Sequence, residues 1–274
     1  MEVSQHSIIR DLYAEKAIHP EDEIRKRINF LKDYLLQTGA KGYVLGISGG
    51  QDSTLAGKLA QLAVDELNKE KNETYNFIGV RLPYGKQFDE EDAMTAMNFI
   101  APSIALTVDI QPAVDQAAQA IEKATGRKLN DFQKGNTKAR ERMKVQYDLG
   151  AMYQCLVIGT NIASEELTGF YTKYGDGACD IAPLYGLNKR QGKQMLQVLQ
   201  APQALYEKVP TADLESDHPG LPDEEALGVT YDEIDDFLEG RKVDASIEAK
   251  LIQLYKQTAH KRKLPTTIYD QWWK

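Results

Sequence analysis

The sequence predicts an α/β protein with a doubly wound parallel sheet of four or five strands and flanking helices. The main observation is that short apolar segments alternate with amphipathic segments from residue 43 to residue 160, an order typical of βαβ units. The chain has 274 residues, which is enough to bury a large core. Neither an internal repeat nor a low-complexity segment interrupts the alternation, so we expect one continuous domain.

Four short apolar segments are the expected strands. The segment YVLGI (43–47) is too short and too uniformly apolar for a surface helix, so we interpret it as a buried strand. The other expected strands are 75–83, 104–110 and 155–160. Parallel strands place their carboxyl ends at one edge of the sheet, where doubly wound folds bind ligands.

Amphipathic segments precede and separate these strands. In 21–37 the apolar residues recur at spacings of three and four, acidic residues occupy the first turn, and Gly39 follows the end. The segment 112–126 begins with proline and ends with glycine, which are the residues typical of the start and the end of a helix. The expected helices are 21–37, 54–70, 89–100, 112–126 and 137–154.

The second half of the chain has a different character. Residues 165–187 are rich in glycine, aromatic and polar residues, and we expect an ordered loop that faces a ligand. Residues 208–228 are rich in proline and acidic residues, and we expect a mobile loop. Two helices near 230–239 and 244–260 are expected to form a C-terminal helical extension.

Composition excludes several classes of protein. Hydrophobic residues make up 42% and charged residues 27% of the chain, which is ordinary for a globular protein. No apolar run of about 18 residues and no secretory leader occur, and the two cysteines form no metal or disulfide pattern. We therefore expect a cytoplasmic protein that does not enter the membrane. The net charge of −8 argues against a nucleic-acid partner but admits a small phosphorylated ligand and a divalent metal.

The stretch LGISGGQDST (45–54) predicts a phosphate-binding loop. Its glycines let backbone N–H groups approach an anion, and the helix that follows adds a partial positive charge. The loop has neither the Walker A pattern GxxxxGK[ST] nor the dinucleotide-binding pattern GxGxxG, and Asp52 stands where a kinase-type loop would carry lysine. A carboxylate beside a polyphosphate is repulsive unless a Mg²⁺ ion lies between them. An ordinary strand–helix turn capped by Asp52 is the alternative on this pattern alone.

Several longer stretches carry a family resemblance. VLGISGGQDSTLAGKLAQ, GNTKARERMKVQY, GFYTKYGDG and PLYGLNKRQGKQ, with four others in the same order across about residues 20–270, resemble bacterial ammonia-dependent NAD synthetases. These enzymes are N-type ATP pyrophosphatases, and the resemblance implies an adenine nucleotide alpha hydrolase-like fold. It also implies a single synthetase domain over residues 1–274, with no glutaminase domain.

The resemblance implies the last step of NAD biosynthesis. The nicotinate carboxylate of deamido-NAD is adenylated by ATP and then amidated by ammonia, which gives NAD, AMP and pyrophosphate. Mg²⁺ is the implied metal. Two alternatives stay open at this point: another ligase of the same superfamily, which would bring a glutaminase region or a basic RNA surface, and a non-catalytic ATP-binding module, which would have lost its metal-binding acids.

The same resemblance assigns site residues. Asp52, Lys189 and Thr211 are the implied catalytic residues, and Asp52 and Glu165 the implied metal ligands, with Glu166 as an alternative to Glu165. The implied ATP-binding residues are Gly46, Ile47, Ser48, Gly49, Gly50, Gln51, Asp52, Ser53, Arg81, Gln87, Thr160, Lys189 and Thr211. The implied deamido-NAD-binding residues are Phe132, Arg140, Phe170, Lys173, Asp180, His260 and Lys261. For the charged residues a solvated surface is the alternative, and for the aromatic residues a place in the core.

Two features complete what the resemblance implies. The family is dimeric, so we expect a symmetric homodimer with sites at the interface. The chain departs from the family where Asn161 and Ile162 replace the more usual aspartate and histidine. If that aspartate helps to remove a proton from ammonium, this chain must do so by other means.

Overall fold

A four-stranded parallel sheet forms the centre of the protein. The computed structural model describes residues 3–71, 73–85, 90–211 and 222–273. The strands lie in the order β3-β2-β1-β4, and Val44 at the centre pairs with Ile78 on one side and Val157 on the other. The parallel α/β fold is therefore confirmed, with four strands in the described part of the chain. The strands are β1 (Gly42–Gly46), β2 (Asn76–Arg81), β3 (Ile104–Thr107) and β4 (Leu156–Val157).

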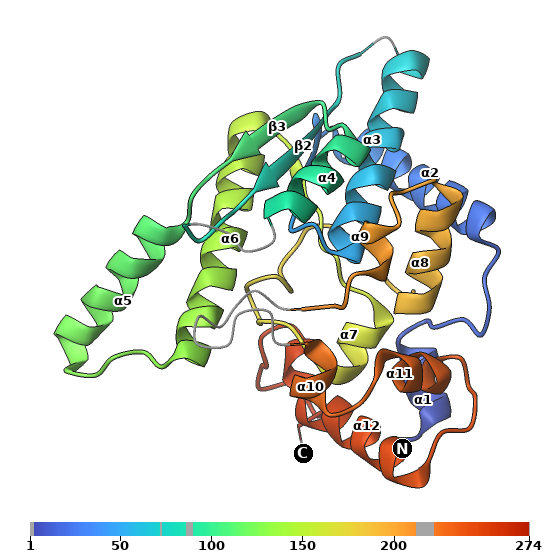
Figure 1. The fold of residues 1–274 in the computed structure, drawn as a ribbon, viewed down its shortest axis with the longest axis vertical. Coiled ribbons are helices and arrows are strands. Elements are labelled where there is room, and N and C mark those ends of the chain that lie inside the picture. Colours follow the sequence, from blue (N-terminus) through green and yellow to red (C-terminus); the bar gives the residue numbers. More distant parts are fainter. Residues whose placement is uncertain (1–2, 72, 86–89, 212–221, 274) are drawn as a thin grey trace.

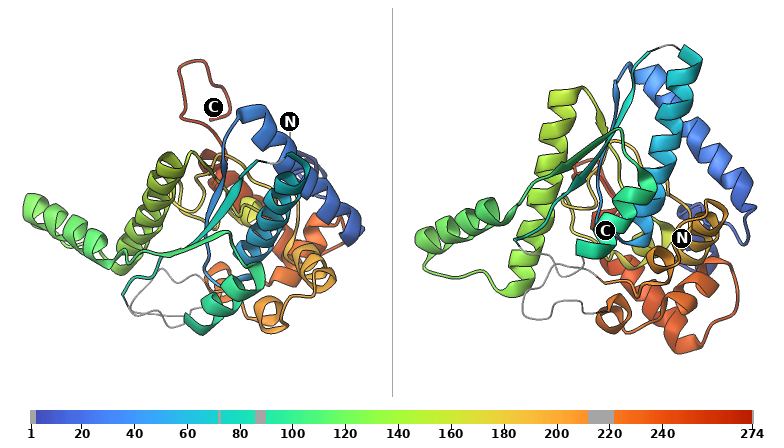
Figure 2. Two further views of the ribbon diagram at one scale, coloured as in Figure 1. Left: turned by 90° about the horizontal axis from the view of Figure 1, so that it is seen from above. Right: turned by 45° about the horizontal axis from the view of Figure 1, so that its top comes forward.

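Helices cover both faces of the sheet (Figure 1). On one face, apolar side chains of α2, α3, α4 and α8 pack with Tyr43, Leu45 and Phe77 in the largest core cluster. On the other face, Val44, Val80 and their neighbours pack against α5 and α6, and the views in Figure 2 keep the two layers on opposite sides. The helices are α2 (Pro20–Thr38), α3 (Gln51–Lys71), α4 (Glu90–Ile100), α5 (Gln111–Thr125), α6 (Asp131–Tyr153) and α8 (Lys189–Val198).

A second core joins the two ends of the chain. Ile8 and Leu12 from the N-terminal helix pack with Leu167, Phe237 and Leu251 from the second half of the chain. In Figure 1 these helices form the lower part of the molecule, below the sheet. The expected C-terminal helical extension is thus confirmed, and it includes the N-terminus. Its elements are α1 (Gln5–Asp11), α7 (Ala163–Thr168), α10 (Asp223–Leu227), α11 (Tyr231–Leu238), α12 (Ala245–Gln257) and the 3₁₀-helix η1 (Ala259–Lys261).

Some expected boundaries were wrong. The expected strand 75–83 ends at Arg81, although Val108 and Ile110 still donate backbone hydrogen bonds to the oxygens of Arg81 and Pro83 beyond the ladder. The expected loop 165–187 begins inside α7. In the segment 208–228, residues 212–221 lie outside the described part, whereas the short helix α9 (Ala204–Glu207) precedes the segment and α10 lies within it.

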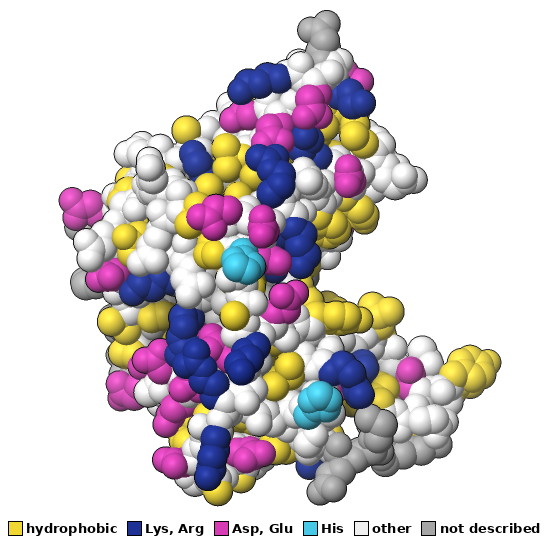
Figure 3. Space-filling model, turned by 90° about the vertical axis from the view of Figure 1, so that its right-hand side faces the viewer, with side chains coloured by type: hydrophobic (Ala, Val, Ile, Leu, Met, Phe, Trp, Pro, Cys, Tyr) yellow, Lys and Arg dark blue, Asp and Glu magenta, His cyan; other side chains and the backbone are white. Residues whose placement is uncertain are grey.

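The described surface is of mixed charge. Figure 3 shows one face of the molecule, on which lysine and arginine side chains are interspersed with aspartate and glutamate. Among the described residues, no helix combines the length and the apolar character that a membrane crossing needs.

Candidate active site

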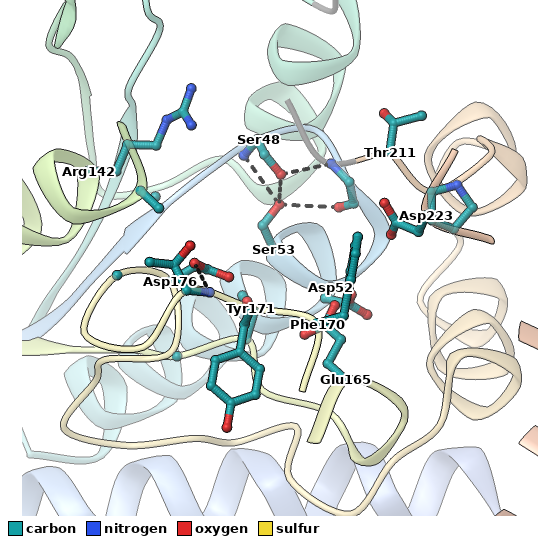
Figure 4. Close-up of a pocket in the computed structure, with 18 of the residues that line it drawn as sticks. Ser48, Asp52, Ser53, Arg142, Glu165, Phe170, Tyr171, Asp176, Thr211 and Asp223 are labelled. Atoms are coloured by element: carbon teal, nitrogen blue, oxygen red, sulfur yellow. Dashed lines mark hydrogen bonds between the residues drawn. The ribbon is translucent and has the colours of Figure 1, made fainter. Parts of the chain in front are cut away.

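Serine hydroxyls hold the loop between β1 and α3 in one conformation. The backbone N–H of Ser48 donates to Ser53 Oγ at 3.3 Å, and the two hydroxyls lie 3.1 Å apart. The Gly50 N–H donates to Ser48 Oγ at 3.2 Å, while the Ser53 hydroxyl donates to the Gly50 carbonyl at the same distance. These bonds appear as the dashed lines around Ser48 and Ser53 in Figure 4. The loop is therefore rigid before any ligand arrives, which lowers the entropic cost of binding an anion.

The loop also packs closely against the start of α4. Gly49 has φ +85°, and a Cβ atom there would lie 2.6 Å from the backbone nitrogen of Ala93. Neither the conformation nor the space admits a side chain, so glycine at this position follows from the contact with α4. Gly50 differs, because a Cβ atom there would meet only Ser48 Oγ, at 3.4 Å.

A cavity of about 580 Å³ opens beside this loop. Figure 4 shows its wall, to which the loop, the start of α7 and the residues flanking 212–221 contribute. Most of the residues implied by the resemblance line it. From the ATP set these are Gly46, Ile47, Ser48, Gly50, Gln51, Asp52, Ser53, Thr160, Lys189 and Thr211, and with them Glu165, Phe132, Phe170 and Lys261.

Three ionisable side chains form a cluster in the cavity wall. Lys189 Nζ lies 2.5 Å from Asp52 Oδ2 and 3.5 Å from Glu165 Oε1. Tyr231 presents its ring to the same ammonium at 5.0 Å. Burial of the ammonium is the largest single influence and lowers its pKa. The charges of Asp52, Tyr231 and Glu165 and the hydrogen bond to Asp52 together outweigh burial, so the pKa of Lys189 lies well above its usual value. Burial, reinforced by the charge of Asp52, raises the pKa of Glu165 to about 8 against the opposing effect of Lys189.

The cluster contains carboxylate oxygens of the kind that bind a divalent cation. A cation, the Lys189 ammonium, lies within reach of both carboxylates, and Asp52 Oδ1 is buried without a hydrogen-bond partner in the described part of the chain. Mg²⁺ is usually held by one or two carboxylates together with substrate phosphates. No cluster of three or more metal-ligating side chains occurs among the described residues, so a metal here would depend on phosphate oxygens for its remaining ligands.

Glu165 and Glu166 point in different directions. Glu165 lines the cavity. Glu166 is 5% exposed and accepts hydrogen bonds from Asn161 Nδ2 at 2.9 Å and from the hydroxyl of Tyr171 at 3.2 Å. The helix α7 places neighbouring side chains about 100° apart, so only one of the pair can face the cavity. Sequence alone could not decide which.

Other implied residues lie away from the cavity. Arg81 is 9% exposed and pairs with Glu90 at 3.0 Å. Asp180 accepts the backbone N–H of Val157 at 2.8 Å and thereby fixes the end of β4. Gly49 faces α4, and Gln87 lies outside the described residues.

Three implied residues gather on the exterior instead. Lys173 Nζ donates to the backbone oxygen of His260 at 2.5 Å, and Arg140 Nη2 donates to that of Lys173 at 3.5 Å. They come from the segment after α7, from η1 and from α6, so the fold brings together groups that are 87 and 33 residues apart. A monomer leaves this cluster open to solvent.

Four charged residues of the cavity were not assigned to the site from the sequence. Arg142 lies two residues after Arg140 on α6, but its Nε donates to the backbone oxygen of Leu82 at 3.0 Å and the residue lines the cavity. The helical period separates the two arginines, and only the packing of α6 shows which one faces inward. The other three residues are Asp176, Lys208 and Asp223.

The fold and the loop define an α/β enzyme that binds a nucleotide at the carboxyl edge of its sheet. The model of the family described as NAD synthase matches residues 23–265. The chain belongs to this family. It is 62% identical over 271 residues to the NH(3)-dependent NAD(+) synthetase of Halalkalibacterium halodurans, which covers 98% of this chain and 100% of that protein.

Solved structures give the same result. The NAD⁺ synthetase of Burkholderia pseudomallei superimposes with a TM-score of 0.82 at 42% identity, covering 95% of this chain and 96% of that one. The NMN synthetase of Francisella tularensis superimposes with a TM-score of 0.79 at 34% identity, covering 93% and 100%. Because the second relative is named for NMN, a mononucleotide, it raises the question whether the substrate of the present chain is a mononucleotide or a dinucleotide.

Gly49→Ala should destabilise the free protein because its Cβ atom would collide with the backbone of α4. We expect a loss of about 1–3 kcal/mol in the free energy of unfolding. Gly50→Ala is the matched control, since its Cβ atom meets only an ordinary contact and should cost no more than about 1 kcal/mol. Urea unfolding of the three proteins measures both values, and equal midpoints for the two variants would contradict the close packing described here.

Proposed function

We propose that this chain makes NAD from deamido-NAD, ATP and ammonia, with the adenylated carboxylate formed in the cavity beside the phosphate loop. The observation that carries the proposal is the cluster of Asp52, Lys189 and Glu165 in a chain that matches an ammonia-dependent NAD synthetase from end to end. We further propose a single synthetase domain over residues 1–274, no nucleic-acid partner, and a place in the cytoplasm.

ATP is needed because a carboxylate cannot lose oxide to ammonia. An oxygen of the nicotinate carboxylate attacks the α-phosphorus of ATP, and the bond from that phosphorus to the bridging oxygen of pyrophosphate breaks. Ammonia then attacks the carbonyl carbon of the mixed anhydride, AMP departs with the bonding electron pair, and one proton is lost from nitrogen. Both steps concentrate negative charge, so positioning and charge neutralisation are the main tasks of the protein.

The phosphate loop and the cluster divide these tasks. The N-terminus of α3, at the end of the loop, would bind phosphate oxygens. The carboxylates of Asp52 and Glu165 would hold Mg²⁺, which neutralises charge on the phosphates when bound. Lys189 would neutralise the departing pyrophosphate, and its held positive charge suits that role because it does not lose its proton near neutral pH. Thr211 lines the same cavity, where its hydroxyl would contact ATP, and its backbone forms a bridge with Pro222.

Deamido-NAD would occupy the other end of the cavity. Phe132, Phe170 and Lys261 line the cavity, and Phe132 is 67% exposed in the single chain. Arg140, Lys173 and His260 lie on the adjoining exterior, and Asp180 is exposed as well. A dinucleotide is long enough to extend from the cavity onto this surface. We propose that a second copy of the chain covers it in a symmetric homodimer.

The products test the proposed function. With Mg-ATP, ammonium and deamido-NAD, the purified chain should release AMP and pyrophosphate in equal amounts with NAD, and only when all three substrates are present. Replacing deamido-NAD by nicotinate mononucleotide should lower kcat/KM by at least tenfold if the surface beyond the cavity binds the second nucleotide. Replacing ammonium by glutamine should abolish turnover. A preference for the mononucleotide would contradict the substrate proposed here.

Asp52→Asn should abolish adenylation while the fold is retained. The amide has the size of the carboxylate but no charge to hold a cation or to fix Lys189, so we expect kcat/KM to fall by about 10²–10³-fold. Glu66→Gln on the same helix is the control, because Glu66 pairs with Arg25 and Lys32 at the protein surface. Pyrophosphate release within about threefold of the parent would exclude the proposed role of Asp52.

Mixing two inactive variants tests the dimer. If Arg140 of one protomer serves the site that contains Asp52 of its partner, an Asp52→Ala/Arg140→Ala mixed dimer has one site with both lesions and one with neither. Random reassortment makes half the dimers mixed, so roughly one quarter of all sites should be intact. Each variant alone should stay nearly inactive. Verified reassortment without recovered NAD formation would show that Arg140 serves its own protomer.

A further inference from the structure

Three polar side chains behind the cavity form one hydrogen-bonded unit that the proposed chemistry does not use. Glu166 lies at its centre, 5% exposed, and accepts from Asn161 Nδ2 at 2.9 Å and from the hydroxyl of Tyr171 at 3.2 Å. Asn161 is itself 9% exposed and accepts from the thiol of Cys179 at 3.8 Å. Both oxygens of Glu166 are thus engaged, each by a different donor.

Tyr171 connects this unit to the cavity. The residue lines the cavity wall, and in Figure 4 its hydroxyl points away from Ser48 and Thr211. Its ring lies against the backbone of Gly177, where a Cβ atom would approach the ring to 2.5 Å. Lys261 Nζ lies 5.4 Å from the ring centre and donates to the Tyr171 backbone oxygen at 2.6 Å. The hydroxyl at the end of the Tyr171 side chain donates its hydrogen bond to Glu166 Oε2.

The pattern of donors and acceptors explains the amide at position 161. The phenol of Tyr171 can donate over the whole working range, because burial and the charge of Glu166 raise its pKa. With an aspartate in place of Asn161, two carboxylates would meet at the present 2.9 Å separation. Two acceptor oxygens would then face each other with no hydrogen atom between them, so the present contact would be lost. An amide at position 161 therefore satisfies Glu166 in the present arrangement, whereas an ionised carboxylate there would not.

We propose, on the basis of the function proposed above, that Glu166 is a positioning residue: it fixes Tyr171 in the wall that receives deamido-NAD and requires an amide at position 161. Residue 161 does not line the described wall of the cavity, and its amide is occupied by Glu166 and Cys179. The amide of Asn161 thus belongs to the support of Tyr171 and is paired with Glu166. Any group that removes a proton from ammonium would therefore be one that faces the cavity.

Exchanging the two polar groups provides the test. Asn161→Asp alone should raise KM for deamido-NAD at least tenfold (about 1.4 kcal/mol) while KM for ATP stays within about twofold. In N161D/E166Q the amide and the carboxylate are exchanged, so the amide now at position 166 can donate to the carboxylate now at position 161 and accept from Tyr171. We expect the double variant to return to within about threefold of the parent in KM for deamido-NAD.

Two further variants separate positioning from general stability. Tyr171→Phe removes only the hydroxyl and should raise KM for deamido-NAD severalfold, and E166Q should add less than twofold in that background because the contact is already lost. Glu23→Gln is the matched control: Glu23 is 7% exposed and pairs with Lys26 and Arg27 on α2. It should lower the thermal midpoint and leave both KM values unchanged.

The outcomes are distinct. Multiplicative effects of N161D and E166Q, or a stability loss without a change in KM for deamido-NAD, would overturn the positioning role. If N161D does not fold, the non-additivity of Tyr171→Phe and E166Q still decides the matter. Failure of the proposed function would appear as a parent chain that forms no NAD, whereas failure of this inference would appear in an active parent whose variants act independently.

Discussion

The buried pair of Lys189 and Asp52 is the interaction on which the site depends. Each residue belongs to the first turn of a helix, α8 and α3 respectively, and Gln51 ties the two starts together by donating to the Lys189 backbone oxygen at 2.9 Å. Removing either charge leaves the other buried without its partner, which is costly. The pair therefore fixes the two helix starts relative to each other and keeps two opposite charges ready for an anion and a cation.

The same arrangement explains why the cavity is at this place. The phosphate loop follows β1, the central strand next to β4, and Glu165 follows β4 itself. Parallel strands end at one edge, so residues more than 100 positions apart reach the same cavity. The second core, built from α1 and the C-terminal helices, also reaches the cavity, because Asp223 and Ala226 of α10 line its wall. Two regions of different composition thus supply one site.

Much of this could be predicted from the sequence, and the remainder has a physical reason. The alternation of apolar and amphipathic segments is a local property, and so is the loop around Asp52. The choice between Glu165 and Glu166, or between Arg140 and Arg142, depends on the rotation of a helix against its neighbours. The contact of Glu166 with Tyr171 depends on where a loop returns. Tertiary packing decides these cases, and local residue patterns along the chain carry no information about it.

Asp180 has a consequence beyond the site. Its carboxylate accepts the N–H of Val157 in β4, and Ile181 forms a bridge with Ile158 just after that strand. An edge strand ordinarily exposes a row of unpaired backbone groups that can recruit another chain. Here a side chain closes the edge of a two-residue strand. The hydrogen–deuterium exchange rate of the Val157 amide would therefore report how often its hydrogen bond to Asp180 opens. A ligand or subunit that touches Asp180 would change this exchange rate, so binding could be followed without a probe inside the cavity.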